Sequence, residues 1–190
     1  MNVLYPEMIY PEIMTYPSIT DGAIDFLNKN ILNKNLIGLE FGIGTSTIYM
    51  AKKFKKFVGI EHNGIYFYNI VTQLSPYDKE KITLILHHSE IDEKTDKLID
   101  SYADELDQFE DEYFDFILVD GRNRIECFKK CDRVLKKGGY IMLDDSQRDK
   151  YQEIFDFYKD KEYFEFVQNT KSKYNPQLGE VVWKTSWWKK

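Results

Sequence analysis

Five short, almost entirely apolar runs, separated by segments with helical spacing, most strongly constrain what this chain can fold into. The runs lie at 36–41, 56–61, 81–88, 114–121 and 140–146. Strands that are apolar on both faces are typical of a parallel sheet that helices cover on both sides. The sequence therefore predicts an α/β fold with a doubly wound sheet.

Two more strands are expected at the end of the chain, at 164–170 and 180–188. Only the turn-rich stretch KSKYNPQLG lies between them, so they should pair antiparallel at one edge of the sheet. The prediction is a Rossmann-like, seven-stranded sheet that is mostly parallel, with an antiparallel C-terminal edge pair. Helices are expected at 125–139 and 149–161, and the charged stretch 92–113 is expected to be a solvated helix and loop.

Length, charge and cysteine content narrow the class of protein. At 190 residues and without a repeat, the chain is expected to form one domain over 1–190. The net charge of −6, with the acids spread along the chain, disfavours a nucleic-acid partner.

The start of the sequence carries three prolines and no basic segment, unlike a signal peptide or a membrane span. We therefore expect a cytoplasmic protein without a membrane partner. Cys127 and Cys131 are expected to be reduced helix residues.

Two glycines follow the first apolar run, at a point where open parallel sheets bind ligands. Gly42 permits a tight turn there, and Gly44 lets the backbone approach a ligand closely. A dinucleotide fingerprint would need a third glycine where Thr47 stands. Glu40 would repel a pyrophosphate but not an ammonium group, and Glu61, which ends the second run, suits ribose hydroxyls. The pattern favours a nucleoside that carries an amino-acid end.

The motifs LEFGIGTS, GIEHN, FDFILVDG and VLKKGGYIMLDDS resemble, in order and spacing, those of class I S-adenosylmethionine (SAM)-dependent methyltransferases. The resemblance covers about residues 15–190. It implies that Gly42 and Gly44 pass under the methionine end of SAM, with Ser46 beside them. Glu40 would lie near the ammonium group, and Glu61 would hold the ribose hydroxyls, unless it is a surface acid. The other residues that the resemblance assigns to the cofactor site are His62, His88, Ser89 and Asp120.

Three acids at the ends of neighbouring strands are the candidate catalytic and metal-binding groups. Asp120 ends the fourth run, and Asp144 and Asp145 end the fifth, so their carboxylates should converge on one rim. The chain resembles metal-dependent O-methyltransferases of catechols and macrolide sugars, which implies Mg²⁺ at these three acids. The catechol-type enzymes carry a lysine base where this chain has Asn123, so Asp120 or Asp144 would have to take the proton, or the metal would have to do most of the activation. Alternatively, Asp145 caps the following helix and Asp144 bonds to backbone or to Arg122.

Arg122 and Arg124 are expected at the mouth of the site as substrate-binding residues. They would orient sugar hydroxyls, or a carboxylate or phosphate of the acceptor, unless they only pair with acids such as Glu126. The stretches VDGR and GGYIMLDDS also resemble small bacterial and viral methyltransferases that are associated with glycan or natural-product decoration. Residues 1–20 are expected to form a lid in which Tyr16 and Ser18 are the candidate contacts, with Tyr16 assigned to the substrate, or else an interface strand of a homodimer.

The resemblance implies an enzyme that transfers a methyl group from SAM to an oxygen atom. The expected acceptor is a sugar hydroxyl in a glycan or glycoconjugate, with Mg²⁺ as a candidate second cofactor. Two alternatives stay open. The acceptor could be a catechol-like small molecule, a protein or RNA. The chain could also be a non-catalytic methyltransferase-like subunit whose aromatic ending, WKTSWWKK, covers a partner, unless alternate residues of this edge strand lie in the core.

Overall fold

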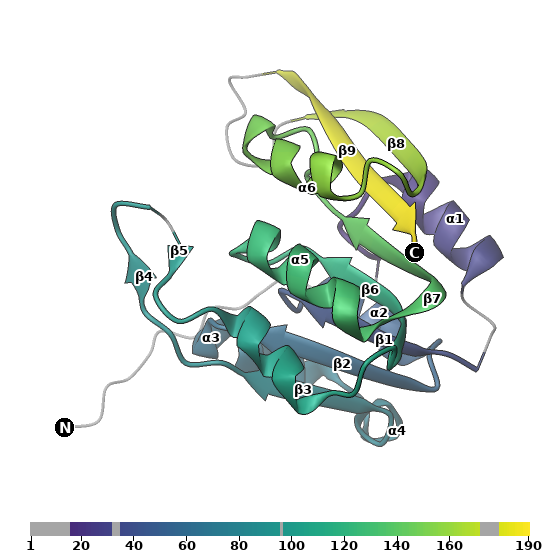
Figure 1. Ribbon diagram of the computed structural model, residues 1–190. Coiled ribbons are helices and arrows are strands. Elements are labelled where there is room, and N and C mark those ends of the chain that lie inside the picture. Colours follow the sequence, from purple (N-terminus) through teal and green to yellow (C-terminus); the bar gives the residue numbers. More distant parts are fainter. Residues whose placement is uncertain (1–15, 32–34, 96, 172–178) are drawn as a thin grey trace.

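The computed structural model describes residues 16–31, 35–95, 97–171 and 179–190, so most of the predicted lid lies outside the described residues. The main sheet has seven strands in the order β3-β2-β1-β6-β7-β9-β8 (Figure 1). Their bounds are Ile82–Leu86 (β3), Lys56–Glu61 (β2), Ile37–Phe41 (β1), Phe114–Val119 (β6), Leu135–Leu143 (β7), Glu180–Lys189 (β9) and Glu162–Lys171 (β8). The pairs from β3 to β7 are parallel, and β9 runs antiparallel between β7 and β8. This confirms the predicted doubly wound sheet and its antiparallel edge pair.

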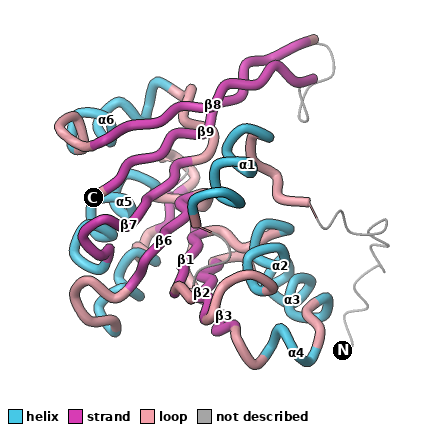
Figure 2. The backbone as a smooth tube through the Cα atoms, turned by 90° about the vertical axis from the view of Figure 1, so that its right-hand side faces the viewer, coloured by secondary structure: helices cyan, strands magenta, loops and turns pink. Residues whose placement is uncertain are grey.

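Helices lie on both faces of the sheet (Figure 2). One face carries α1 (Asp21–Asn30), α2 (Thr45–Ala51) and α3 (Gly64–Gln73), and the other carries η1 (Tyr102–Gln108), α5 (Arg124–Val134) and α6 (Gln152–Phe157). The remaining short elements are α4 (Pro76–Lys79), η2 (Asp149–Tyr151) and a separate hairpin of β4 (Ile91–Asp92) and β5 (Lys97–Leu98). Within the described ranges, no helix has the length and apolar character that crossing a membrane requires.

Burial on both faces explains why the strands are continuously apolar. Consecutive strand residues point to opposite faces. In β6, Phe116 packs under α1 and α2, whereas Ile117 packs against the α5 side of the sheet. The same alternation corrects the interpretation of the aromatic ending as a partner-binding surface. Trp187 and Trp188 are both buried, in the two clusters on opposite faces of β9.

The stretch 92–113 differs from the predicted solvated helix and loop. It forms the β4–β5 hairpin and the 3-10 helix η1, whose Tyr102 and Leu106 are fully buried against the sheet. Several of its acids face α5 instead, where the Lys130 amine lies 2.7 Å from the Asp104 carboxylate and 2.9 Å from that of Asp107. The prediction was wrong because it followed the many acids of this stretch. It overlooked the apolar residues between them, which complete the core.

Two helix boundaries also differ. The helix expected at 125–139 ends at Val134, because Leu135 already pairs with Phe114 of β6 as the first residue of β7. The helix expected at 149–161 is divided into η2 and α6. These differences shorten the helices without moving them to another face.

Candidate functional site

A cavity of about 800 Å³ lies at the carboxyl ends of β1, β2, β6 and β7. This is the edge where open parallel sheets bind ligands, and the volume suits a small-molecule site. The loop after β1 contributes Gly44 and Ser46, and the end of β2 contributes Glu61. The loops after β6 and β7 contribute Asp120 and Asp144. The structure therefore brings together predicted residues that lie far apart in the sequence.

The two glycines after β1 are needed for different reasons. Gly42 has a φ of +84°, and a Cβ there would lie 2.7 Å from the Cα of Gly121, so it serves the turn and the close approach of two strand ends. A Cβ on Gly44 would lie 3.5 Å from the Tyr66 hydroxyl and 3.8 Å from the Ser46 hydroxyl, all three of which line the cavity. Gly44 thus leaves room for a ligand against bare backbone.

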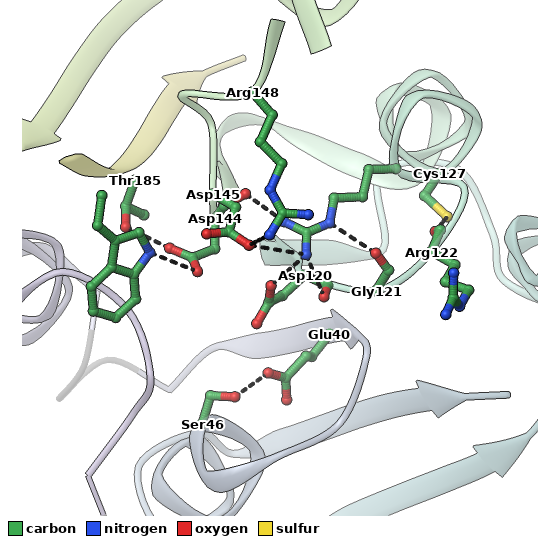
Figure 3. A network of polar contacts seen from close by, with 12 residues as sticks. Glu40, Ser46, Asp120, Gly121, Arg122, Cys127, Asp144, Asp145, Arg148 and Thr185 are labelled. Atoms are coloured by element: carbon green, nitrogen blue, oxygen red, sulfur yellow. Dashed lines mark hydrogen bonds and ion pairs between the residues drawn. The ribbon is translucent and has the colours of Figure 1, made fainter. Parts of the chain in front are cut away.

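Glu40 lies behind this loop and does not line the cavity. It is fully buried, and the Ser46 hydroxyl donates to its carboxylate (Figure 3). The Thr47 hydroxyl donates to the same carboxylate. Thr47 Oγ1 in turn accepts from the Gly44 amide at 2.7 Å. Burial raises the pKa of Glu40 to about 8, although the two hydroxyl donors act in the opposite direction. Glu40 therefore fixes the first residues of α2 in place. It affects the cavity only indirectly, through Ser46, whose hydroxyl bonds to its carboxylate.

Glu61 is held at the rim of the cavity by the backbone that follows it. Its Oε1 accepts from the amides of His62, at 2.9 Å, and Asn63, at 2.8 Å. Its Oε2 accepts no hydrogen bond within the described part of the chain, so it is available to a donor in the cavity. Asn63 and Tyr66 also line the cavity and were not predicted. The Asn63 side chain caps α3 by accepting from the Tyr66 amide at 3.0 Å, and an asparagine ahead of a helix is the signal that sequence reasoning missed.

His88 and Ser89 do not reach this cavity, so the structure does not bring them together with the other predicted cofactor residues. They line a separate shallow depression beside Asp100. The reason is that β3 ends at Leu86 and the chain turns away, with Ser89 Oγ accepting from the Asp100 amide at 3.0 Å. Thr95, between β4 and β5, lines the main cavity from this side instead.

The three predicted acids do converge, with one carboxylate oxygen from each lying within 4.8 Å of the others (Figure 3). Asp144 is 3% exposed; its Oδ1 accepts from the Thr185 hydroxyl at 2.7 Å and its Oδ2 from the Trp183 indole at 3.2 Å. Burial, together with the negative charge of Asp120, raises the pKa of Asp144 well above the ordinary range. Asp145 does not cap a helix through its side chain; it pairs with Arg148.

The predicted substrate-binding residues lie in three different surroundings. Arg122 lines the cavity as expected. Arg124 also lines the cavity, but it is 8% exposed and lies against the carboxylates and the strand ends, so only its expected place at the mouth of the site is corrected. Its side chain extends from the start of α5 toward the ends of β6 and β7, because backbone carbonyls that follow these strands accept its N–H groups. Tyr16 is 52% exposed, does not line the cavity, and donates to Asp21 at 3.4 Å, whereas Ser18 of the same segment does line it.

Other residues on the acceptor side of the cavity were not predicted. They come from the segment after β7 and from the β8–β9 pair, and include Gln147, Arg148, Lys150, Tyr151, Val181 and Trp183. The stretch SQRDKY follows the paired acids directly, and its mixture of amide, cationic and aromatic side chains was the available signal. Nothing in the local pattern indicates that β9 lies beside β7, so the position of Trp183 could not be foreseen.

The three acids fit a divalent cation poorly, although their spacing would allow one. Asp120 already binds Arg124, and Asp145 binds Arg148. Both oxygens of Asp144 accept hydrogen bonds from β9. A hard cation needs such oxygens as ligands, so it would have to displace these donors and enter beside two guanidinium groups. The prediction of Mg²⁺ stays a prediction without support from this arrangement.

Comparison with known proteins supports the fold alone. No protein-family model and no curated protein sequence matches this chain. A precorrin-6y C5,15-methyltransferase from Geobacter metallireducens has a TM-score of 0.66 at 19% identity, covering 94% of this chain and 95% of its own. A SAM-dependent O-methyltransferase from Thermotoga maritima has 0.62 at 12%, covering 94% and 67%. A Streptococcus mutans protein solved in complex with SAH has 0.60 at 13%, covering 88% and 96%. The chain therefore has the fold of class I SAM-dependent methyltransferases, as its motifs predicted.

Proposed function

We propose that this chain is a SAM-dependent O-methyltransferase that acts on a hydroxyl of a sugar in a glycan or glycoconjugate. One observation carries the proposal: a single cavity is lined by Gly44, Ser46 and Glu61 on one side and by Asp120 and Asp144 on the other. The first group suits SAM, and the second suits removal of a proton from an acceptor. The methyltransferase fold supports the activity, while oxygen as the acceptor atom and the sugar are our inference.

The cofactor half of the cavity is expected to hold SAM by its two polar ends. The bare backbone at Gly44 accommodates the methionine end, with the Ser46 hydroxyl beside it. Glu61, fixed through Oε1, presents Oε2 to the ribose hydroxyls. When bound, SAM supplies a methyl group on a positively charged sulfur. The protein then has only to hold that methyl group in line with the acceptor oxygen.

Proton removal is the second task of the site, and Asp144 is the proposed general base. The acceptor oxygen forms a bond to the methyl carbon while the carbon–sulfur bond breaks, which leaves a methyl ether and S-adenosylhomocysteine. The hydroxyl proton passes to the Asp144 carboxylate. A carboxyl whose pKa is raised by burial is a stronger base, once ionised, than an ordinary aspartate. Asp120, on the same rim, is the second residue expected to orient the hydroxyl.

A hydroxyl-rich acceptor matches the polar character of the remaining wall. Arg122, Gln147, Arg148 and Lys150 offer hydrogen-bond donors there, and Trp183 offers a flat apolar ring. The three cations would also suit an acidic sugar or a sugar phosphate. The buried Arg124, in contrast, is not expected to contact the acceptor.

The first experiment is calorimetric titration of SAM and of S-adenosylhomocysteine, followed by transfer of labelled methyl groups to a panel of saccharides and catechols. Glu61→Gln should weaken SAM binding about tenfold or more, because it removes an acceptor charge from the ribose site. Asp144→Asn should abolish transfer while SAM still binds. Glu153→Gln, on the exposed face of α6, is the matched control for the loss of one negative charge.

The outcomes separate the proposal from its alternatives. Failure of the native chain to bind SAM would refute the enzyme and favour a non-catalytic subunit. Binding with transfer only to catechols would refute the sugar acceptor. Binding with no transfer to any small acceptor would move the assignment to a protein or RNA substrate.

A further inference from the structure

The guanidinium of Arg124 lies where a cation among the three acids would be needed. Its Nη2 is 2.9 Å from Asp120 Oδ1 and 3.9 Å from Asp145 Oδ2. Asp144 is the third member, and its backbone carbonyl accepts from Nη1 of the same guanidinium. A single fixed positive charge therefore contacts all three acidic residues.

Backbone carbonyls fix this guanidinium in place. The Gly121 carbonyl accepts from Nε at 2.8 Å, and the Asp120 carbonyl accepts from Nη2 at 2.9 Å. These carbonyls follow β6, while that of Asp144 follows β7, so one side chain joins the ends of two neighbouring strands. The Tyr151 ring lies 5.5 Å from the guanidinium carbon. Such a planar fork, bonded through all three of its nitrogens, cannot move aside as an exposed arginine can.

The guanidinium of Arg124 keeps its positive charge although it is buried. Burial alone lowers the pKa of an arginine, but here Asp120, then Tyr151 and the other two acids, outweigh it and raise the pKa. The side chain is thus cationic at any pH at which the protein is folded. A divalent ion bound to Asp120 and Asp145 would face this charge at close range and would be repelled.

We propose that Arg124 is a positioning residue that takes the place of a metal ion, so that the acid cluster works without a divalent cation. Its guanidinium holds the carboxylates of Asp120 and Asp145 in their orientations. It also supplies the positive charge that offsets the negative charges of the three acids. Only one consequence of this proposal rests on the proposed function, namely that methyl transfer needs no metal. Binding of a divalent ion to the three acids can be measured without turnover.

The test is titration of the protein with Mn²⁺ alone, followed by electron paramagnetic resonance of the free ion. The native chain should show no saturable Mn²⁺ site among these acids. A saturable site in the native chain that Asp145→Asn or Asp144→Asn weakens would overturn the proposal. This measurement needs no arginine variant, so it holds even if such variants fold poorly.

Arginine variants then test the position itself. Arg124→Met should gain a Mn²⁺ site at least about tenfold tighter than any in the native chain, and adding Asp145→Asn should remove it. Arg124→Lys keeps the charge and should gain none. Arg148→Met is the matched control, because Arg148 also pairs with Asp145 but is more exposed. A folded Arg124→Met without the new site, or an equal gain in Arg148→Met, would overturn the assignment to Arg124.

Calorimetric binding of S-adenosylhomocysteine to the same samples keeps the two proposals distinguishable. A native chain that binds this ligand and also binds Mn²⁺ at the acids retains the proposed function and loses this inference. A chain that binds neither retains the inference about the cluster and loses the proposed function.

Discussion

Replacing Glu40 with glutamine should remove a pH dependence that this buried carboxyl imposes on the stability of the fold. Glu40 has no exposure to solvent, and its carboxylate contacts the hydroxyls of Ser46 and Thr47. Burial raises its pKa to about 8 in the folded chain, from an ordinary value of 4.5. Glutamine has almost the same shape, can still bond to both hydroxyls, and is neutral at every pH.

The sign and size follow from linkage between proton binding and folding. Below the ordinary pKa, both the folded and unfolded chains hold the proton, so the carboxyl has no pH-dependent effect. As the pH rises from about 4.5 to about 8, the unfolded chain has lost the proton and the folded chain retains it, so the free energy of unfolding falls. The slope is about 1.4 kcal/mol per pH unit, or about 2.7 kcal/mol between pH values of roughly 5.5 and 7.5. Above about 8 the loss is complete.

The assay is urea unfolding of the native chain and of Glu40→Gln at several pH values in this range. The variant should gain stability relative to the native chain as the pH rises, because it has no proton to lose. Glu153→Gln, which changes an exposed acid of α6, should show no such trend. A difference between Glu40→Gln and the native chain that stays constant with pH would refute the raised pKa and show that the two hydroxyls keep Glu40 ionised.

Three further substitutions test the site. Thr185→Val removes the hydroxyl that donates to Asp144 at 2.7 Å, so the pKa of Asp144 should rise further. In a plot of transfer rate against pH, the acidic limb should then move up by about one pH unit. Thr185→Ser keeps the hydroxyl and should return the acidic limb to its native position. Gly44→Ala should weaken SAM binding about tenfold with little change in melting temperature, since its Cβ would enter the cavity; an unchanged affinity in calorimetry would contradict this. Gly42→Ala should instead destabilise the fold by about 2–3 kcal/mol, because its φ is +84° and Gly121 lies against it; urea unfolding measures the loss, and a neutral result would contradict the strain.

The sequence predicted the fold and half of the site because both depend on where strands end. A run such as FDFILVDG is apolar throughout since β6 is buried on both faces, and its terminal Asp120 must then emerge at the carboxyl edge. Glu61 and Asp144 follow by the same logic. The failures concern side-chain direction after the strand. His88 leaves the site because the chain turns into the β4–β5 hairpin, and Arg124 turns inward to a carbonyl 20 residues away, which no local pattern encodes.

The rim beside the three acids is held rigid by contacts that offset a local backbone cost. Asn123 and Asp145 adopt left-handed backbone, with φ of 48° and 53°, which costs roughly 1 kcal/mol each. The Asn123 side chain accepts from the Leu98 amide at 3.0 Å and donates to its carbonyl at 3.3 Å, while Asp145 binds Arg148. Between them, Arg124 joins the carbonyls that follow β6 and β7. Because all these contacts form within the protein alone, the acids are oriented before any ligand arrives. We therefore expect this rim to act by fixed positioning of the acceptor, and not by closing over it.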